Sequence, residues 1–170
     1  MKNSIIFLLS VSLLVGLMSC EKQELEIWES STAKVDGNWM LRYDHDDYGV
    51  DPFGNGFTQH FIYNNAANDG KSIWLEDHNT FWAYKVLLPV SLDNLTFGST
   101  DTVINQVDGY DIKVIVSNGK IYKDAVTLPS SLVVDSISFD IWFEDLEGAT
   151  GIAEDVLHVG GYRQSGFEED

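Results

Sequence analysis

The stretch 137-ISFDIWFE-144 indicates the class of fold more clearly than any other part of the chain. Its apolar residues recur at every second position, and successive side chains of a β-strand point to opposite faces of a sheet. One face of this strand would carry Ile137, Phe139, Ile141 and Phe143. No apolar pattern with the helical period persists for a dozen residues, so the sequence predicts an all-β protein.

Further strands are expected on both sides of this stretch. They are predicted at 38–43, 57–63, 72–76, 80–88, 94–97, 112–116, 120–126 and 156–163. Both faces of 80–88 are largely apolar, which is typical of a barrel wall whose outer side is covered or faces a ligand. Asn118-Gly119 lies between two of these segments and is a strong hairpin signal, so a tight turn is expected there.

These segments amount to about eight to ten short strands, and such a number at regular spacing predicts an antiparallel barrel or sandwich. A closed barrel is favoured because few segments carry the prolines or charges that protect exposed edge strands. Pro89 and Pro129 fall at strand ends, where proline is tolerated. An open β-sandwich is the alternative.

The N-terminus has the features of a lipoprotein signal. Lys2 precedes an apolar stretch at 5–17, which is shorter than the roughly 20 residues that span a bilayer. Leu17-Met18-Ser19-Cys20 then resembles a bacterial lipobox, in which the cysteine sulfur receives a diacylglycerol. Cys20 is the only cysteine, so it has no disulfide partner within the chain. The alternative is an ordinary secretory signal.

This interpretation divides the chain into three parts. Residues 1–19 are the predicted signal peptide, 20–35 the lipidated N-terminus and flexible tether, and 36–170 a lipocalin-like barrel domain. The acids at Glu21, Glu24 and Glu26 resemble signals that place some Gram-negative lipoproteins on the outer face of the outer membrane. We therefore expect an outer-membrane lipoprotein that faces the cell exterior, with a periplasm-facing domain as the alternative.

The charge of the chain argues against one class of partner. It has 10 Lys and Arg against 27 Asp and Glu, a formal net charge of −17. A surface this negative repels phosphate backbones, so nucleic acid is not an expected partner. It also disfavours anionic lipid head groups, so contact with the membrane is expected through lipidated Cys20.

Catalytic and metal motifs are weak. No Gly-x-Ser-x-Gly elbow is present, and chance pairing of His45, His60, His78 or His158 with an acid is expected in so acidic a chain. The stretch 44-DHDDYGVD-51 has acids at positions one and three of a calcium loop but lacks the bidentate acid at position twelve. We expect no cofactor, no metal and no catalytic residue, which leaves enzyme activity uncertain and disfavoured.

Two motifs near the beginning and the end of the predicted barrel sequence carry a resemblance. Gly37-Asn38-Trp39 opens the first strand, and Arg163 ends the last. In lipocalins a Gly-x-Trp pairs with such an arginine, whose guanidinium packs over the indole at the closed end of the barrel. The resemblance assigns Gly37, Trp39 and Arg163 a structural role in barrel closure, because a planar cation over a tryptophan face is stabilising.

Longer stretches are similar to a known family. The segments "FIYNNAANDGKSIWLED", "FWAYKVLLPVSLDNLTF" and "GGYRQSGFEED" resemble bacterial surface lipoproteins described as lipocalin-like, "lipid-binding putative hydrolases". The resemblance extends from about Gly37 to Asp170 and implies the barrel fold and a lipid-like ligand. It supplies no catalytic residues.

Several aromatic residues are candidates for the wall of a ligand cavity. They are Trp74, Trp82, Tyr84 and Trp142. They could enclose a lipid tail, stack on sugar rings at the cell surface, or simply pack. The favoured function is binding of a small apolar or amphipathic ligand. The alternatives are a glycan-capture or interaction module beside surface uptake machinery, and a weak hydrolase.

Overall fold

The computed structural model describes residues 29–151, 155–167 and 170, and this part of the chain is almost entirely β-structure. The elements are β1 (Gly37–His45), β2 (Gly49–Val50), β3 (Thr58–Asn64), β4 (Ser72–Glu76), β5 (Lys85–Ser91), β6 (Thr96–Ile104), β7 (Lys113–Thr127), β8 (Val133–Phe143), α2 (Leu146–Thr150) and β9 (Leu157–Arg163). Cys20 and the predicted signal peptide lie outside the described residues. The described part contains no helix long and apolar enough to cross a membrane.

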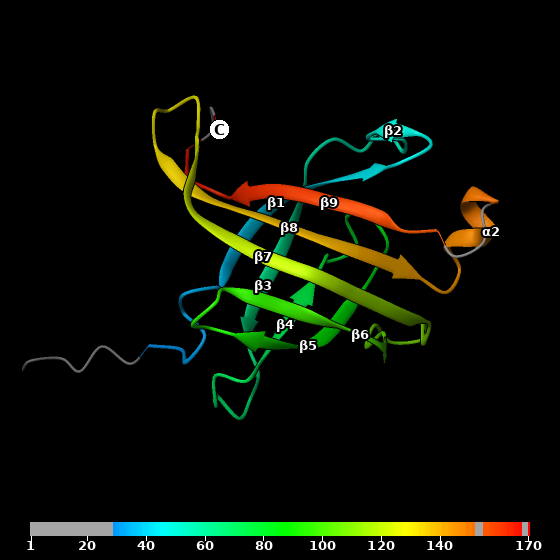
Figure 1. Cartoon of the computed structure of the whole chain (residues 1–170), viewed down its shortest axis with the longest axis horizontal. Coiled ribbons are helices and arrows are strands. Elements are labelled where there is room, and N and C mark those ends of the chain that lie inside the picture. The colour runs from blue at the N-terminus through cyan, green and yellow to red at the C-terminus, as the bar shows by residue number, and fades with distance from the viewer. Residues whose placement is uncertain (1–28, 152–154, 168–169) are drawn as a thin grey trace, which may run out of the picture.

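The sheet closes on itself. Each strand from β3 to β9 pairs antiparallel with the next, and β1 pairs with both β3 and β9 (Figure 1). The closing ladder runs from Trp39 opposite Arg163 to Asp44 opposite His158. The result is a closed eight-stranded antiparallel barrel, with β2 as one extra strand on the edge of β1. The predicted all-β barrel is confirmed, and the open sandwich is excluded because β1–β9 pairing leaves no open edge.

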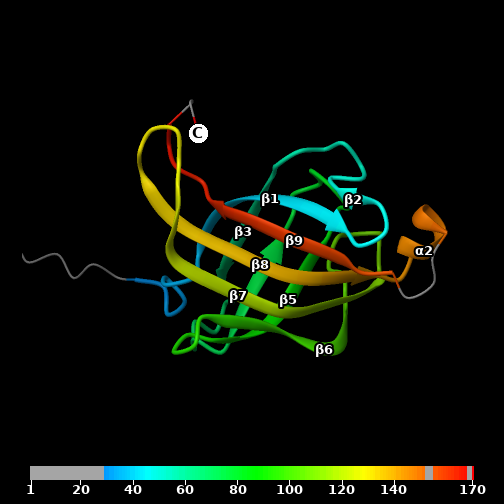
Figure 2. The same cartoon turned by 45° about the horizontal axis from the view of Figure 1, so that its top comes forward.

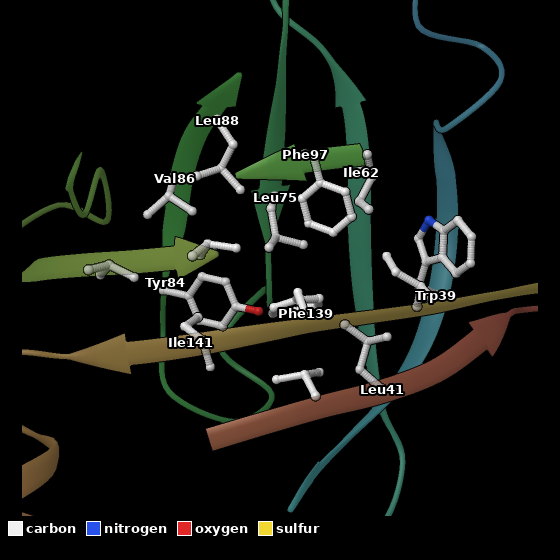
Figure 3. Packing of buried hydrophobic residues seen from close by; sticks show 14 of the residues in the cluster. Trp39, Leu41, Ile62, Leu75, Tyr84, Val86, Leu88, Phe97, Phe139 and Ile141 are labelled. Atoms are coloured by element: carbon white, nitrogen blue, oxygen red, sulfur yellow. The ribbon is translucent and has the colours of Figure 1, made fainter. Parts of the chain in front are cut away.

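The interior of the barrel is filled by side chains. β8 alternates between buried and partly exposed residues as the period-two pattern predicted, and Ile137, Phe139, Ile141 and Phe143 are at most 2% exposed. Side chains from the other strands meet them in one cluster (Figure 3). The largest fully buried residues are Trp39, Tyr84, Phe143, Leu41, Ile62, Ile73, Leu75, Leu88, Ile121, Ile137, Ile141 and Leu146. These residues form the core of the described part of the chain.

The hairpin predicted at Asn118-Gly119 is wrong. β7 continues through both residues, and its pairing with β8 shifts between Ser117 and Lys120. Asn118 has a φ of 55°, but Gly119 is outside the positive-φ region, whereas a type I′ turn needs positive φ at both positions. The dipeptide instead forms a bulge. A Cβ at Gly119 would collide with the carbonyl oxygen of Phe97 on β6.

The strand predicted at 80–88 is also wrong in its first half. Residues 77–84 form a loop, and β5 begins at Lys85. The apolar residues of this loop lie at one end of the barrel and do not pair with a neighbouring strand. Their alternation in the sequence therefore resembled that of a strand. In contrast, β6 extends to Ile104, well beyond the predicted 94–97.

The two ends of the barrel differ. We call one end the mouth: it carries the loops 46–57, 77–84 and 105–112 and the segment 144–151 with α2 (Figure 2). The other, the closed end, receives the chain before β1 and carries the β7–β8 turn and the C-terminus. Residues 31–35 form turns there, and Thr32 and Val35 are fully buried. The packed unit thus includes the last residues of the predicted tether.

Candidate functional site

The closed end is built around a tryptophan and an arginine. The guanidinium carbon of Arg163 lies 4.6 Å from the centroid of the Trp39 ring, and Trp39 is fully buried. Gly37 has a φ of 151°, and a Cβ there would collide with Nη1 of Arg163. Only glycine allows the arginine to approach the backbone this closely, so the three residues form one structural unit.

Hydrogen bonds hold the guanidinium over the indole. Nη1 donates to the carbonyl of Asp36, and Nη2 donates to that of Lys34 at 3.4 Å. Nε and Nη2 contact Oδ2 of Asp135 on β8 at 3.2 and 3.1 Å. Lys123 Nζ reaches the same oxygen at 2.7 Å, so Asp135 bridges two cations. This network joins the entering chain to the last two strands.

Three aromatic side chains from two loops cover the mouth. We call Phe53, Phe81 and Trp82 the aromatic lid. Phe53 packs edge-on against Phe81 and Trp82, with ring centroids 5.3 and 5.9 Å apart. Phe81 stacks on Tyr43 of β1 at 3.7 Å, and Trp82 stacks on Phe143 of β8 at 5.3 Å. All three lid residues are only half buried, so apolar surface at the mouth remains accessible to solvent.

A buried carboxylate shapes the loop that presents two lid residues. Asp77 is fully buried and accepts backbone N–H bonds from the loop at 2.7–3.0 Å. The donors are Asn79, Phe81, Trp82, Ala83 and Tyr84. His78, Asn79 and Ala83 have positive φ, which is costly for residues other than glycine. Asp77 offsets this cost because five N–H dipoles compensate its charge.

Directly beneath the lid lies a buried polar cluster, which consists of Tyr43, His60 and Tyr84. The hydroxyl of Tyr43 lies 2.6 Å from Nε2 of His60 and 3.0 Å from the hydroxyl of Tyr84. His60 Nδ1 is 3.0 Å from the carbonyl of Thr58, so Nδ1 carries the proton and Nε2 accepts from Tyr43. Tyr84 then donates to the Tyr43 oxygen. In Figure 3 the Tyr84 hydroxyl points into the barrel.

Burial keeps all three members of the cluster uncharged. Loss of solvent lowers the pKa of His60 to about 4. Burial likewise raises the pKa values of the Tyr43 and Tyr84 phenols well above 10.0. Near neutral pH the cluster is therefore a chain of neutral hydrogen-bonding groups in an apolar core.

Asp145, at the start of the α2 segment, ties the lid to the rest of the mouth. Trp82 Nε1 donates to its Oδ1 at 3.0 Å, and the Tyr110 hydroxyl donates to its Oδ2. Burial and this hydrogen bond raise the pKa of Tyr110 to about 12. Three of the mouth segments thus meet at one carboxylate.

Open hollows flank the lid on both sides. One of about 280 Å³ is lined by His45, Tyr48, Pro52, Phe53 and Thr150. Another of about 320 Å³ is lined by Asn79, Phe81, Trp82, Ala83, Tyr110 and Asp145. The aromatic lid separates them, because Phe53 contributes to the first and its two partners to the second.

The match to a protein family gives this geometry a context. The family model described as "Lipid-binding putative hydrolase" matches residues 24–168. The chain belongs to this family. The resemblance seen in the sequence is thereby confirmed, and the match takes in the entire barrel. A comparison with curated proteins gave no match.

The family description includes hydrolysis, which through a serine nucleophile needs a histidine base hydrogen-bonded to the hydroxyl. In the described residues, no serine hydroxyl is hydrogen-bonded to a histidine. His60 is fully buried, and both of its ring nitrogens are occupied. His78 is exposed beside Glu76, and His158 lies outside the barrel between Asp46 and Asp140.

His45 at the mouth comes closest to a catalytic arrangement. It pairs through Nε2 with Asp155, and both side chains are buried. Its Nδ1, however, accepts the backbone N–H groups of Asp47 and Tyr48 at 2.9 and 3.2 Å. A histidine base needs a free lone pair directed at a nucleophile, and here that lone pair is used to fold the loop. The His45–Asp155 pair therefore links the end of β1 to the segment before β9.

Two acids of the stretch with partial calcium-loop spacing form ion pairs. Asp44 forms a bidentate pair with Arg42 at 2.9 Å, and Asp46 contacts His158 at 3.2 Å. Within the described residues, no group of three or more His, Cys, Asp or Glu is placed to hold a metal ion.

The four aromatic candidates from the sequence do not share one cavity. Tyr84 and Trp82 meet at the mouth, where both contact Phe143. Trp74 lies on the outer face of β4, where Lys85 Nζ is 5.2 Å from its ring. Trp142 lies on the outer face of β8 and lines a separate hollow of about 350 Å³. Strand alternation places Trp74 and Trp142 outside, because their immediate neighbours on β4 and β8 take the buried positions.

Sequence reasoning missed four residues of the mouth: Phe53, Phe81, Tyr43 and His60. Tyr43 and His60 had a usable signal, because each is a polar residue at an inward position of its strand. A buried polar residue on such a face needs a partner, and the two strands that carry them are neighbours. Phe53 and Phe81 lie in loops, where no periodicity identifies them.

Proposed function

We propose that this chain is a lipid-anchored outer-membrane protein whose barrel binds a small amphipathic, lipid-like ligand at the mouth without catalysing its hydrolysis. The observation that carries the proposal is the half-buried aromatic lid above the buried polar cluster. The family description supports a lipid-like ligand. Such a ligand needs apolar surface for its tail and a hydrogen-bonding group for its head, and the mouth supplies both.

The lid provides the place for the apolar part of the ligand. Its residues belong to loops rather than strands, so they can move without breaking the barrel ladders. Phe53 is followed by Gly54 and Gly56, which have φ values of 70° and 62° and give its loop conformational freedom. Displacement of Phe53 and Phe81 would join the two flanking hollows and uncover Tyr43. A lipid tail would then replace the aromatic contacts.

The absence of catalysis is inferred from the histidines. Each described histidine is buried with both nitrogens occupied, or is exposed with carboxylates as its polar partners. Hydrolysis through a covalent intermediate needs a nucleophile within hydrogen-bond reach of a base. Binding at the mouth makes no such demand.

The proposed location rests on the lipobox-like segment that ends at Cys20 and on the acids that follow it. The chain enters the barrel at the closed end, which supports an arrangement in which the mouth points away from the anchoring membrane. In that orientation the mouth is open to ligands outside the cell or to surface uptake machinery.

Tryptophan fluorescence tests where the ligand binds. The protein lacking residues 1–20 keeps the complete barrel and is titrated with 1-dodecanoylglycerol. Binding at the mouth should shift the emission of Trp82 because its contacts with Phe53 and Phe143 change. The shift should disappear in Trp82→Phe and persist in Trp142→Phe, the matched control on the outer face. Native mass spectrometry of the protein purified from cells should show a co-purifying lipid.

A second candidate function is glycan capture on the outer face. Trp142 lines an open hollow together with Ser117 and Asp140, and an aromatic face beside polar groups suits stacking on a sugar ring. Soluble oligosaccharides that quench Trp142, together with no response of Trp82 to lipid, would favour this function over the first.

A further inference from the structure

We infer that the ligand accepted at the mouth has an uncharged, hydroxyl-bearing head that binds the Tyr43–His60–Tyr84 cluster, and that the barrel discriminates against carboxylate and phosphate heads. The inference rests on the proposed function and names the chemical class of its ligand. A monoacylglycerol or a fatty alcohol fits this class, whereas a fatty-acid anion or a phospholipid does not.

The hydrogen-bond pattern of the cluster favours a hydroxyl. The Tyr43 proton is directed to His60 Nε2 at 2.6 Å, and the Tyr84 proton to the Tyr43 oxygen at 3.0 Å. Both donors are thus used, while the Tyr84 oxygen still has lone pairs to accept a bond. A hydroxyl head can donate to that oxygen. A carboxylate offers acceptors only, so it would have to break an existing bond to gain a donor.

Among the described residues, no Lys or Arg is placed to compensate an anionic head beneath the lid. The described residues include eight of the ten Lys and Arg; the other two are Lys2 and Lys22. Those nearest the mouth are each paired with an acid on the outside of the barrel: Arg42 with Asp44, Lys85 with Glu76, and Lys113 with Glu144. The remaining ones, Lys34, Lys71, Lys120, Lys123 and Arg163, lie in the closed-end half. An anion beneath the lid would therefore be buried without a counterion.

The rim of the mouth adds a repulsive field. Its loops carry Asp46, Asp47, Asp51, Asp108, Asp111, Glu144, Asp145 and Glu147. Fields of one sign concentrate at such openings and oppose the approach of like charges. An anionic head thus meets repulsion at the rim and lacks compensation below it.

The two buried acids of the mouth do not change this balance. Asp77 is saturated by five backbone N–H bonds, and Asp155 is paired with His45. Neither provides a positive charge, and the backbone donors around Asp77 are already used. The polar groups beneath the lid that still have hydrogen-bonding capacity are consequently the neutral ones of the cluster.

The test compares two ligands with the same tail, 1-dodecanoylglycerol and dodecanoate, near neutral pH and below micelle formation. Affinities for the protein lacking residues 1–20 are measured by Trp82 emission and checked by native mass spectrometry. We expect the glycerol ester to bind at least about tenfold more tightly, a difference of about 1.4 kcal/mol. Dodecanoate binding equally well or better would overturn the inference and leave the proposed function intact. Binding of neither ligand would instead reject the proposed function.

Two tyrosine variants test the role of the cluster. Tyr84→Phe keeps the ring and removes the hydroxyl, so it should weaken the glycerol ester about tenfold and leave dodecanoate almost unchanged. Tyr63→Phe is the matched control, because its hydroxyl lies on the outer face of β3, where it donates to Glu76. Near-ultraviolet circular dichroism shows whether each variant keeps its tertiary structure. If Tyr84→Phe folds and leaves the affinity ratio unchanged, the head group does not bind the cluster.

Discussion

Replacement of Arg163 by alanine tests how the barrel is held closed. The substitution removes the cation over Trp39 and the donors to the carbonyls of Asp36 and Lys34. It leaves the eight-stranded ladder itself unchanged, because Arg163 is the last residue of β9. Any loss of stability therefore measures the contribution of the Arg163 side chain.

The size of the effect follows from the individual contacts. A cation over a partly desolvated indole contributes about 1–2 kcal/mol. Each carbonyl left without its donor costs about 1 kcal/mol, and less for the Lys34 bond because it is long, at 3.4 Å. The ion pair with Asp135 adds little, because the Arg163 side chain is 25% exposed and Lys123 keeps its contact with the carboxylate. The expected total is roughly 2–3 kcal/mol.

Urea unfolding at equilibrium, followed by tryptophan emission, measures this difference, and calorimetry gives the thermal counterpart. For a domain of this size a loss of 2–3 kcal/mol corresponds to a fall in Tm of roughly 5–10 °C. Arg163→Lys should recover only part of the loss, because an ammonium lacks the planar fork that stacks and donates in two directions. Lys123→Ala is the matched control, since it also removes a partner of Asp135 but does not touch Trp39.

The outcome that contradicts this reasoning is specific. If Arg163→Ala destabilises the domain by less than about 0.5 kcal/mol, or no more than Lys123→Ala does, then stacking and carbonyl capping at the closed end contribute nothing beyond a surface ion pair. Full rescue by lysine would likewise show that charge alone is sufficient. Ligand preference should be unchanged in all three variants, because the closed end is opposite the mouth.

Three further predictions concern the mouth and the anchor. Burial lowers the pKa of His60 to about 4, so between pH 6.5 and 4 the unfolded chain binds a proton that the folded protein does not. The free energy of unfolding should therefore fall by up to roughly 3 kcal/mol as the pH decreases through that window. Urea unfolding as a function of pH should show this slope in the wild type and a flatter one in His60→Gln; equal slopes would contradict the buried neutral imidazole. Cys20→Ala should abolish labelling by radioactive fatty acid and block removal of the signal peptide, and persistent labelling would reject lipidation at Cys20. The purified protein should hydrolyse short-chain p-nitrophenyl esters no faster than buffer, and turnover lost in His45→Ala or His60→Ala would show that the protein is an enzyme.

Much of the fold could be predicted because strand periodicity is a local signal. The inward residues of β8 were identified correctly, since a period of two places them on one face whatever their partners are. Local signals failed where a tertiary contact decided the backbone. Asn118-Gly119 has hairpin chemistry, but close approach of Phe97 and continued pairing with β8 make it a bulge. The apolar run at 80–84 alternates like a strand, but the Asp77 carboxylate folds it into a loop.

The candidate site was less predictable than the fold. Tyr84 and Trp82 lie at the mouth, but aromatic character alone grouped them with Trp74 and Trp142, which the alternation in β4 and β8 places on the outer wall. The sequence could not predict that Phe53 lies at the mouth, because the position of a loop residue depends on the strands that the loop connects.

The sequence by itself determined the all-β class and the negative charge, because composition and alternation are properties of the chain, and its resemblance to lipocalins implied the pairing of Trp39 with Arg163. Only the tertiary structure decided which polar side chains meet inside the barrel. Tyr43 lies on β1, His60 on β3 and Tyr84 in the loop before β5, and their hydrogen bonds form only when the folded barrel brings these segments together. Burial then shifts their pKa values, and burial is a property of the closed barrel rather than of any single segment.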